Sequence, residues 1–431
     1  MKFWLAPSIM LSCIILSANA GNWTFDDCVQ YARENNIDLR KARLSEQTAG
    51  YNLEEAKALW QPSLDFGTSH QFGNYPWNEN SKNVYNSSYS LNAGWTVWDG
   101  GARPNTIKRR VIDSEISRIS TDDMMRTLET DLLQVYLNIL YARESVEVYN
   151  DAVKLSKAQA ERAKALWETG KASKVDYAQL QAQYEQDKYA LVDAQGQYDN
   201  RRMELKKLLE LGIEQNFDIE TVELTEAQVM QTLPPMDESY TMALDTDLLL
   251  KSLDLEKDGT AVDIAIAKAA GLPRITLSAG VGTGYAAPGV SFGNALKFNF
   301  GETAGISIAV PILDNKKTRM AVARAKVQQL DAELDIESRR TDLAQLVENW
   351  YIDTRSAQAR YSAAEEQLKA AELTDELTNE QFALGLVNPI DLMSSHNNLI
   401  AARHSLLQAK YMAVLGLKMI EYYRTADISL K

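Results

Sequence analysis

The stretch Leu128-Glu-Thr-Asp-Leu-Leu-Gln-Val-Tyr-Leu-Asn-Ile-Leu140 places apolar side chains three and four residues apart, which is the periodicity of a helix. It belongs to a run from Arg103 to Glu168 that contains one Pro, close to its start, and no Gly. A helix over the whole run would be roughly 100 Å long, about three times the hydrocarbon thickness of a bilayer. The run is therefore too long for a globular core helix, and it is too charged to lie in lipid.

The long run occurs twice, and each copy turns at a glycine. The first turn reads Trp167-Glu-Thr-Gly-Lys-Ala-Ser-Lys-Val-Asp-Tyr177, and its counterpart reads Phe382-Ala-Leu-Gly-Leu-Val-Asn-Pro-Ile-Asp-Leu392. Asp99 and Asp314 precede the two runs in the same register. A match at a fixed spacing indicates an internal tandem duplication.

The duplication divides the chain into segments. We predict a first repeat over 21–209, with a strand pair at about 63–98 and a long helical hairpin over 103–209. A linker over 210–236 follows, or alternatively an equatorial segment that forms a small side domain against the long helices. The second repeat covers 237–423, with a strand pair at about 274–311 and a hairpin over 317–423, and leaves a tail over 424–431.

The first twenty residues are typical of a cleaved secretory signal, because Lys2 precedes a short apolar run that ends in Ala18-Asn-Ala20. The alternative is a transmembrane anchor, for which the apolar run is short. Only Cys28 remains after cleavage, so the exported chain has no internal disulfide. The net charge of −14 argues against nucleic acid as a partner. No later stretch is apolar enough for a membrane helix, so any crossing of a bilayer would use strands.

Both predicted strand pairs alternate apolar or aromatic side chains with uncharged polar ones, in stretches of about the ten residues that a tilted membrane strand needs. Soluble hairpins packed on a core are the alternative. Four strands cannot close a barrel, and lipid does not tolerate an open sheet edge, so the membrane interpretation requires several chains to share one barrel. Aromatic residues near the strand ends resemble an interfacial membrane girdle: Trp95, Trp98, Tyr285 and Phe300. The apolar face is formed by Leu64, Phe66, Tyr85, Tyr89, Leu91, Ala93, Trp95, Val97, Ile275, Leu277, Ala279, Val281, Ala304, Ile306 and Ile308, among others.

The sequence offers no catalytic residue, no cofactor site and no metal site. His70 lies in a strand, and His396 and His404 are eight residues apart on a helix. None of the three has a nucleophile or a set of metal ligands nearby in sequence. Most carboxylates alternate with Lys and Arg on helical faces, which is typical of a solvated surface. We therefore expect no enzymatic activity.

Asp176 and Asp391 stand at equivalent places, six residues after the turn glycines. One interpretation is structural, since Ser173 and Asn388 have the position of helix N-caps and the aspartates that of N3. The other is functional, because chains arranged around an axis would bring these carboxylates into a ring that attracts cations. The two interpretations are compatible.

The chain resembles the TolC-like outer-membrane efflux proteins. The resemblance rests on the signal segment, the duplication, strands that begin after Pro62 and Pro273, Asp99 and Asp314 before the long runs, and the Gly and Asp six apart at both turns. It implies an α+β membrane protein of a Gram-negative cell, a homotrimer whose twelve strands form one β-barrel in outer-membrane lipid. The helical hairpins would form an α-barrel in the periplasm. It also implies docking to a periplasmic adaptor (membrane fusion) protein that couples the duct to an inner-membrane transporter.

The resemblance also implies roles for the residues at the turns. The adaptor-docking tips would be Gly170, Lys171, Ala172 and Ser173, and Gly385, Leu386, Val387 and Asn388. The entrance ring would hold Asp391 and Asp176, with Ser394 where relatives have a second aspartate. Relatives can lock the entrance with a tyrosine and an arginine, where this chain has Phe382 and Val387.

The expected function is a passive exit duct for small toxic compounds or drugs. One alternative is a duct for type I protein secretion. Another, of a different class, is a non-conducting coiled-coil spacer or adhesin stalk.

Overall fold

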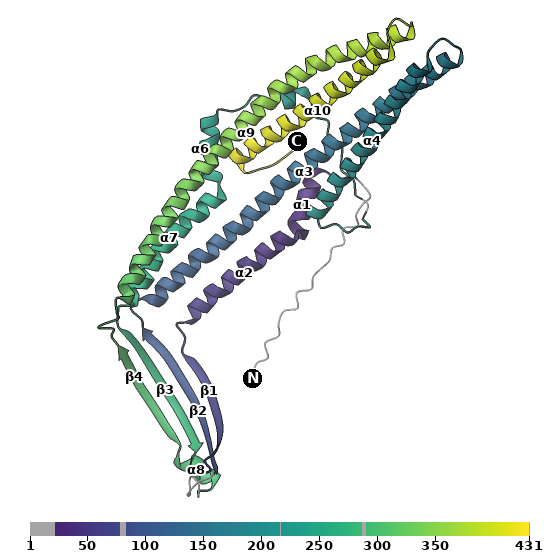
Figure 1. Ribbon diagram of the computed structural model, residues 1–431. Coiled ribbons are helices and arrows are strands. Elements are labelled where there is room, and N and C mark those ends of the chain that lie inside the picture. Colours follow the sequence, from purple (N-terminus) through teal and green to yellow (C-terminus); the bar gives the residue numbers. More distant parts are fainter. Residues whose placement is uncertain (1–21, 78–82, 216, 287–289, 431) are drawn as a thin grey trace. The chain divides into compact units, whose positions relative to one another are not determined.

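A computed structural model describes residues 22–77, 83–215, 217–286 and 290–430, and the expected signal segment 1–20 lies outside these ranges. The described elements appear in Figure 1. They are, in order, α1 (Phe25–Asn35), α2 (Ile37–Ala58), β1 (Ser63–Asn74), β2 (Asn83–Trp98), α3 (Ala102–Glu168), α4 (Lys174–Leu208), α5 (Glu226–Val229), α6 (Met236–Thr246), α7 (Leu248–Ala269), β3 (Arg274–Tyr285), α8 (Phe292–Phe298), β4 (Gly301–Ala309), α9 (Lys317–Ala383) and α10 (Pro389–Thr425).

The chain divides into two compact units. The sheet unit comprises 41–124 and 247–343, and the hairpin unit comprises the described residues up to 40 together with 125–246 and 344 onward. The long helices α3 and α9 each run for 67 residues and contribute to both units. The predicted continuous runs are thus confirmed, and their ends agree with the prediction to within a residue or two.

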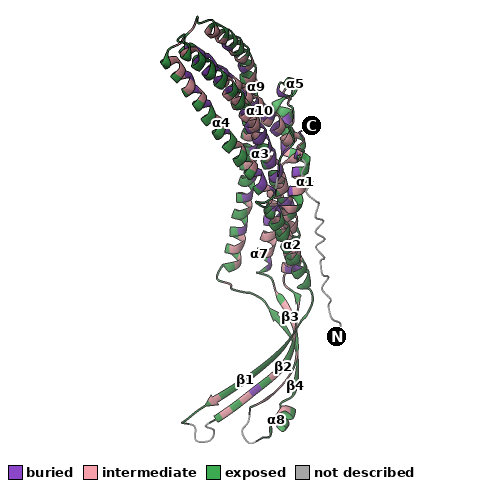
Figure 2. Cartoon of the chain, turned by 90° about the vertical axis from the view of Figure 1, so that its right-hand side faces the viewer, coloured by how far each residue is buried: buried purple, intermediate pink, exposed green. Residues whose placement is uncertain are grey.

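The sheet unit contains one antiparallel sheet in the order β1-β2-β3-β4. Its register keeps the predicted apolar face on one side: Leu64 lies opposite Ala93, which lies opposite Ala279, which lies opposite Ala304. Most of the sheet is exposed or half-buried in the single chain (Figure 2). β1 and β4 are the edges of the sheet in the single chain.

Two features of the sheet differ from the sequence prediction. The register shifts between Thr96 and Trp98, so Trp98 pairs with Ile275 and Val97 is the extra residue of a bulge. Strict alternation predicts continuous pairing through Val97, but the bulge leaves Val97 without a partner in β3 and disrupts the ladder there. In addition, α8 separates β3 from β4. It is held to β3 by hydrogen bonds from Thr283 Oγ1 to Leu296 O (2.5 Å) and from Asn299 Nδ2 to Gly284 O (2.8 Å).

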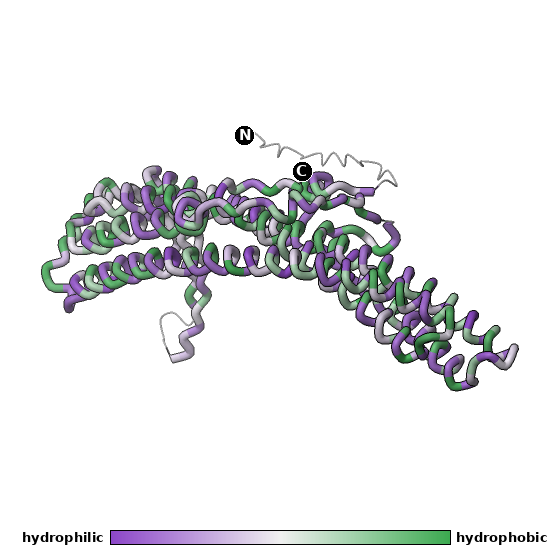
Figure 3. The backbone as a smooth tube through the Cα atoms, turned by 90° about the horizontal axis from the view of Figure 1, so that it is seen from above, coloured by the Kyte–Doolittle hydropathy of each residue, from purple (hydrophilic) through white to green (hydrophobic). Residues whose placement is uncertain are grey.

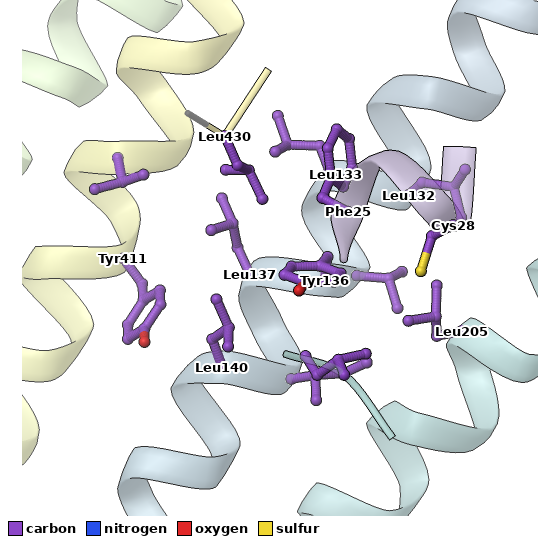
Figure 4. Packing of buried hydrophobic residues seen from close by; sticks show 14 of the residues in the cluster. Phe25, Cys28, Leu132, Leu133, Tyr136, Leu137, Leu140, Leu205, Tyr411 and Leu430 are labelled. Carbon is purple, nitrogen blue, oxygen red and sulfur yellow. The ribbon is translucent and has the colours of Figure 1, made fainter. Parts of the chain in front are cut away.

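The hairpin unit is built on an apolar core where α3 meets α1, α4 and α10. Hydrophilic and hydrophobic residues are interspersed along the long helices (Figure 3), so the core depends on a stripe rather than on a uniformly apolar helix. Figure 4 shows Phe25 and Cys28 of α1 near Leu132 and Tyr136 of α3. The most buried large side chains here include Leu132, Leu133, Tyr136, Ile139, Leu140, Leu205, Leu209 and Ile219.

The segment predicted as a linker and the predicted tail both contribute to this core. Ile219 and Val229 are fully buried, and Leu430 is 9% exposed within the same cluster. Trp23 and Ile219 form an isolated parallel bridge, with Trp23 N donating to Asp218 O and Glu220 N donating to Trp23 O, each at 2.9 Å. The linker therefore fastens the N-terminal segment to α3.

Among the described residues, no helix combines the length and the apolarity needed to cross a membrane.

Cys28 is predicted to be chemically inert in the folded protein. Its side chain is fully buried, and burial together with the nearby charge of Asp27 raises the pKa of its thiol to about 12. The thiolate is the reactive form, so we expect thiol reagents to modify native protein at least about a hundredfold more slowly than protein unfolded in urea. Equal rates in a colorimetric thiol assay, with the exposed single-cysteine variant Tyr189→Cys/Cys28→Ser as the fast control, would contradict this.

Candidate functional site at the hairpin tips

The two turns share one backbone geometry. Gly170 and Gly385 have φ values of +74° and +77°, in the left-handed region that residues with a Cβ adopt at a cost. Lys171 N donates to Leu166 O at 2.8 Å, and Leu386 N donates to Gln381 O at 2.9 Å. These bonds satisfy carbonyl groups that the ends of α3 and α9 leave free. Both outgoing helices therefore end in the same type of glycine cap.

The returning helices begin with the predicted caps. Ser173 Oγ accepts a hydrogen bond from Asp176 N (3.1 Å), while Asp176 Oδ2 accepts one from Ser173 N (3.0 Å). At the second tip Asn388 Oδ1 accepts from Asp391 N (3.0 Å), and a proline follows at the first helical position. The capping interpretation is thus confirmed for Ser173, Asp176 and Asn388, whereas Asp391 takes part through its backbone N–H alone.

The two aspartates nevertheless differ in their surroundings. The Asp176 carboxylate is half-buried and bonded to its N-cap, whereas Asp391 is exposed. Ser394, one turn further along α10, is also exposed. The single chain thus presents Asp391 and Ser394 to solvent, and the ring that would combine them with other chains remains a prediction.

The residues between the glycines and the caps are accessible. Lys171, Ser173, Leu386 and Asn388 are exposed, while Ala172 and Val387 are half-buried. Three neighbouring apolar side chains that were not predicted as site residues are also exposed, namely Val175 (63%), Leu384 (75%) and Ile390 (62%). Each lies within a few residues of a turn glycine in the sequence, at the end of a hairpin.

Aromatic stacking supports the first tip. The rings of Trp167 and Tyr177 are parallel to within 1°, with centroids 5.6 Å apart, and Lys174 Nζ lies 5.9 Å from the Trp167 ring. These contacts join the end of α3 to the start of α4. At the second tip the equivalent positions hold Phe382 and Leu392, which belong to a small apolar cluster instead.

Behind the tips the two hairpins contact each other. That cluster contains Ala160, Ala163 and Leu180 of the first hairpin together with Leu392 of the second. Arg162 Nη2 donates to Ala383 O at 3.2 Å, and Gln159 Nε2 donates to Asn379 Oδ1 at 2.7 Å. The small alanine side chains therefore allow the helices to pack closely.

One buried polar pair was not predicted. His396 Nε2 of α10 lies 3.0 Å from Asp187 Oδ2 of α4, and the two residues are 1% and 4% exposed. They are 209 residues apart in sequence, so no local spacing could reveal the pair. Within the described ranges, no group of three His, Cys, Asp or Glu side chains could hold a metal ion.

The predicted girdle residues lie at the two ends of the sheet. Trp95 and Trp98 are at the end of β2, and Trp95 Nε1 donates to Trp60 O at 2.9 Å. Tyr285 ends β3, and Phe300 immediately precedes β4. Their role as a membrane girdle remains a prediction.

A family model described as outer membrane efflux protein matches residues 28–210 and 240–415. The chain belongs to this family. The matched ranges include all four strands, the first hairpin and the second hairpin up to residue 415 of α10.

Known outer membrane efflux proteins resemble the chain over most of its length. The outer membrane efflux protein BepC of Brucella suis biovar 1 (strain 1330) is 20% identical over 436 residues, which cover 96% of this chain and 88% of BepC. The alkaline protease secretion protein AprF of Pseudomonas aeruginosa is 22% identical over 311 residues, 70% of this chain and 63% of AprF. The crystal structure of the outer membrane protein VceC from Vibrio cholerae superposes with a TM-score of 0.75 at 15% identity, covering 92% of this chain and 95% of VceC.

Membership of the outer membrane efflux family establishes the class of the protein. It is an outer-membrane export channel with a helical periplasmic extension in a Gram-negative cell, and it is not an enzyme. The predicted resemblance is therefore confirmed. Family membership also favours a channel over the non-conducting stalk.

Proposed function

We propose that the protein is the exit duct of a tripartite export system and that three copies assemble into one channel. The observation that carries the proposal is the four-stranded sheet, which has one apolar face and two free edges in a single chain. Exposed apolar side chains on that face, such as Phe66 (68%) and Ile306 (70%), need lipid to cover them. Pairing β1 of one copy with β4 of the next would form a twelve-stranded β-barrel and leave no edge in the membrane.

The hairpin tips are the proposed docking surface for a periplasmic adaptor that couples the duct to an inner-membrane transporter. Both tips expose apolar side chains next to capped, rigid turns. Two tips with the same backbone geometry in every chain would give a trimer six similar sites. This agrees with the proposal that the chain arose by tandem duplication, which the two matched ranges also support.

Small toxic compounds or drugs are the proposed cargo, and secretion of a polypeptide is the second candidate. BepC is named for efflux, whereas AprF is named for secretion of alkaline protease. Deletion of the gene separates the two cargoes. Increased drug sensitivity supports efflux, while unchanged sensitivity with loss of one secreted protein supports secretion.

The first test is the native mass of protein extracted from membranes in mild detergent. We expect three chains, released only by detergent, that form ion-conducting pores in a planar bilayer. A water-soluble monomer would overturn the shared-barrel proposal. A detergent-bound trimer that does not conduct ions would instead favour the non-conducting stalk.

Asp391→Asn is expected to reduce cation selectivity. If three copies of the exposed Asp391 surround the entrance, their charge concentrates cations there. We expect the cation-to-anion permeability ratio to fall by about two- to tenfold, together with weaker block by polyvalent cations. Reversal potentials measured in a salt gradient provide the ratio.

A matched control for this variant is Glu168→Gln, which also removes one exposed carboxylate near a tip, at the end of α3. An equal effect of both variants would mean that general surface charge sets the selectivity. Unchanged selectivity in Asp391→Asn with a less stable α10 would limit Asp391 to capping.

A further inference from the structure

A layer of buried polar side chains crosses the hairpin unit behind the tips. We call it the polar layer, and it contains residues of all four helices. Its members, all less than 9% exposed, are Ser156 and Gln159 of α3, Gln183 and Asp187 of α4, Asp375 of α9, and Ser395 and His396 of α10. Apolar residues lie on the tip side of it, in the cluster around Leu180 and Leu392.

Hydrogen bonds in the polar layer form two strings that connect different helices. Asp187 bonds to His396 (3.0 Å) and to Gln183 (2.8 Å), whose Nε2 also lies 3.2 Å from Asn397 Oδ1. The second string leads from Ser395 to Asp375 (3.0 Å), then to Asn379 (2.9 Å) and Gln159 (2.7 Å). The layer thus ties the first hairpin to the second by polar bonds.

The bonding of the polar layer is incomplete in this arrangement. His396 Nδ1, Gln159 Oε1 and Gln183 Oε1 are buried and have no hydrogen-bond partner among the described residues. Unpaired buried polar atoms cost free energy. The polar layer therefore stabilises the described arrangement by less than a fully paired network would.

The charges around His396 are mostly negative. Burial raises the pKa of Asp187, but hydrogen bonds from His396, Ser156 and Gln183 outweigh burial and lower its pKa overall, so it is ionised at neutral pH. His396 also lines a cavity of about 380 Å³. The titratable groups that line the cavity with it are Asp151 of α3, Glu372, Asp375 and Glu376 of α9, and Arg403 of α10. Burial, and to a smaller extent the charge of Asp187, raise the pKa of Tyr149 of α3.

We propose that the Asp187–His396 pair is a pH-sensitive latch that holds α4 of the first hairpin against α10 of the second. When the imidazole is protonated, the pair is a buried ion pair within an acidic environment. When it is neutral, the buried Asp187 carboxylate receives no counter-charge from His396, and the hairpins separate more readily.

The direction of the pH effect follows from this charge balance. Imidazole is the side chain that gains or loses its charge between about pH 5 and 8. The latch is therefore stronger while the imidazole is protonated and weaker once it is neutral. Asp187 contributes no change here, because a lowered carboxylate pKa lies below the range.

Hydrogen exchange of the purified full-length protein tests the latch without requiring a channel. The measured quantity is the amide exchange rate of residues 183–190 and 392–400, divided by the intrinsic exchange rate at each pH. We expect this ratio, which reports local opening, to be about fivefold higher at pH 8 than at pH 6. His396→Gln retains a donor for Asp187 but does not titrate, so its opening should be independent of pH. Asp187→Asn should abolish the pH response as well.

The chain provides a matched control. It contains three histidines, and His404 lies two turns from His396 on the same helix, half-buried against Tyr149. His404→Gln should keep the pH response of the original protein. Three results would each overturn the proposal. The original protein shows no pH response, the response survives in His396→Gln, or the response disappears in His404→Gln.

Coupling of the latch to transport rests on the proposed duct function and has its own measurement. In planar bilayers, pore opening should increase by a similar factor from pH 6 to pH 8, and His396→Gln should remove the increase. If hydrogen exchange depends on pH but pore opening does not, the coupling to transport is overturned and the latch is not. An absence of pores in all variants would instead overturn the duct proposal.

Discussion

Tyr136→Ala should lower the free energy of unfolding by about 3–5 kcal/mol, the largest effect we expect from a single change. The Tyr136 side chain is fully buried on α3 and packs edge-on against Phe25 at a centroid distance of 5.7 Å. Its hydroxyl lies 3.1 Å from Glu220 O and 3.3 Å from Trp23 O. Truncation would leave a cavity and release both the N-terminal segment and the segment around Ile219. Urea unfolding in detergent, followed by helical circular dichroism, measures the change.

Two variants separate the contributions of Tyr136. Tyr136→Phe keeps the ring and loses the hydroxyl, so it should cost about 1–2 kcal/mol. Tyr189→Ala removes a tyrosine that is 76% exposed on α4 and should change stability by less than about 0.5 kcal/mol. If the losses in Tyr136→Ala and Tyr189→Ala were equal, the core assigned to α3 would be wrong.

Gly416→Ala should destabilise the protein by about 1–3 kcal/mol, although alanine is the better helix former. A Cβ at Gly416 of α10 would overlap Thr354 Oγ1 and lie 3.0 Å from Thr354 Cβ and 3.3 Å from Thr354 Cα. Thr354 of α9 is fully buried and its backbone Cα is part of the contact, so rotation of the Thr354 side chain alone does not make room. The same unfolding measurement applies.

Gly196→Ala is the matched control on α4. Nothing lies within 4 Å of a Cβ built there, so helix propensity alone should act and stabilise the protein by about 0.5–1 kcal/mol. In the Thr354→Ala background, Gly416→Ala should lose most of its cost, because the two changes share one contact. A stabilising Gly416→Ala in the original background would contradict the close approach of α9 and α10.

The sequence alone determined the features that depend on neighbours along the chain. The apolar stripe around Leu140 predicted the long helices, and the glycines at 170 and 385 predicted the turns. Ser173 and Asn388 predicted the caps, because an N-cap and its N3 partner are three residues apart. Alternation predicted the strands and the side of the sheet on which Leu64 and Ala279 lie. Membership of the outer membrane efflux family followed from the order of these local signals.

Only the tertiary structure decided which distant residues meet. Asp187 and His396 pair across 209 residues, Val97 has no partner in β3 because of a bulge, and Leu430 of the predicted tail is buried in the core. Whether alanine stabilises or destabilises the protein at Gly196 and at Gly416 also depends on what lies beside each glycine in space. Local propensity and periodicity involve residues a few positions apart, whereas packing, buried pairs and register are set by side chains that only the folded chain brings together.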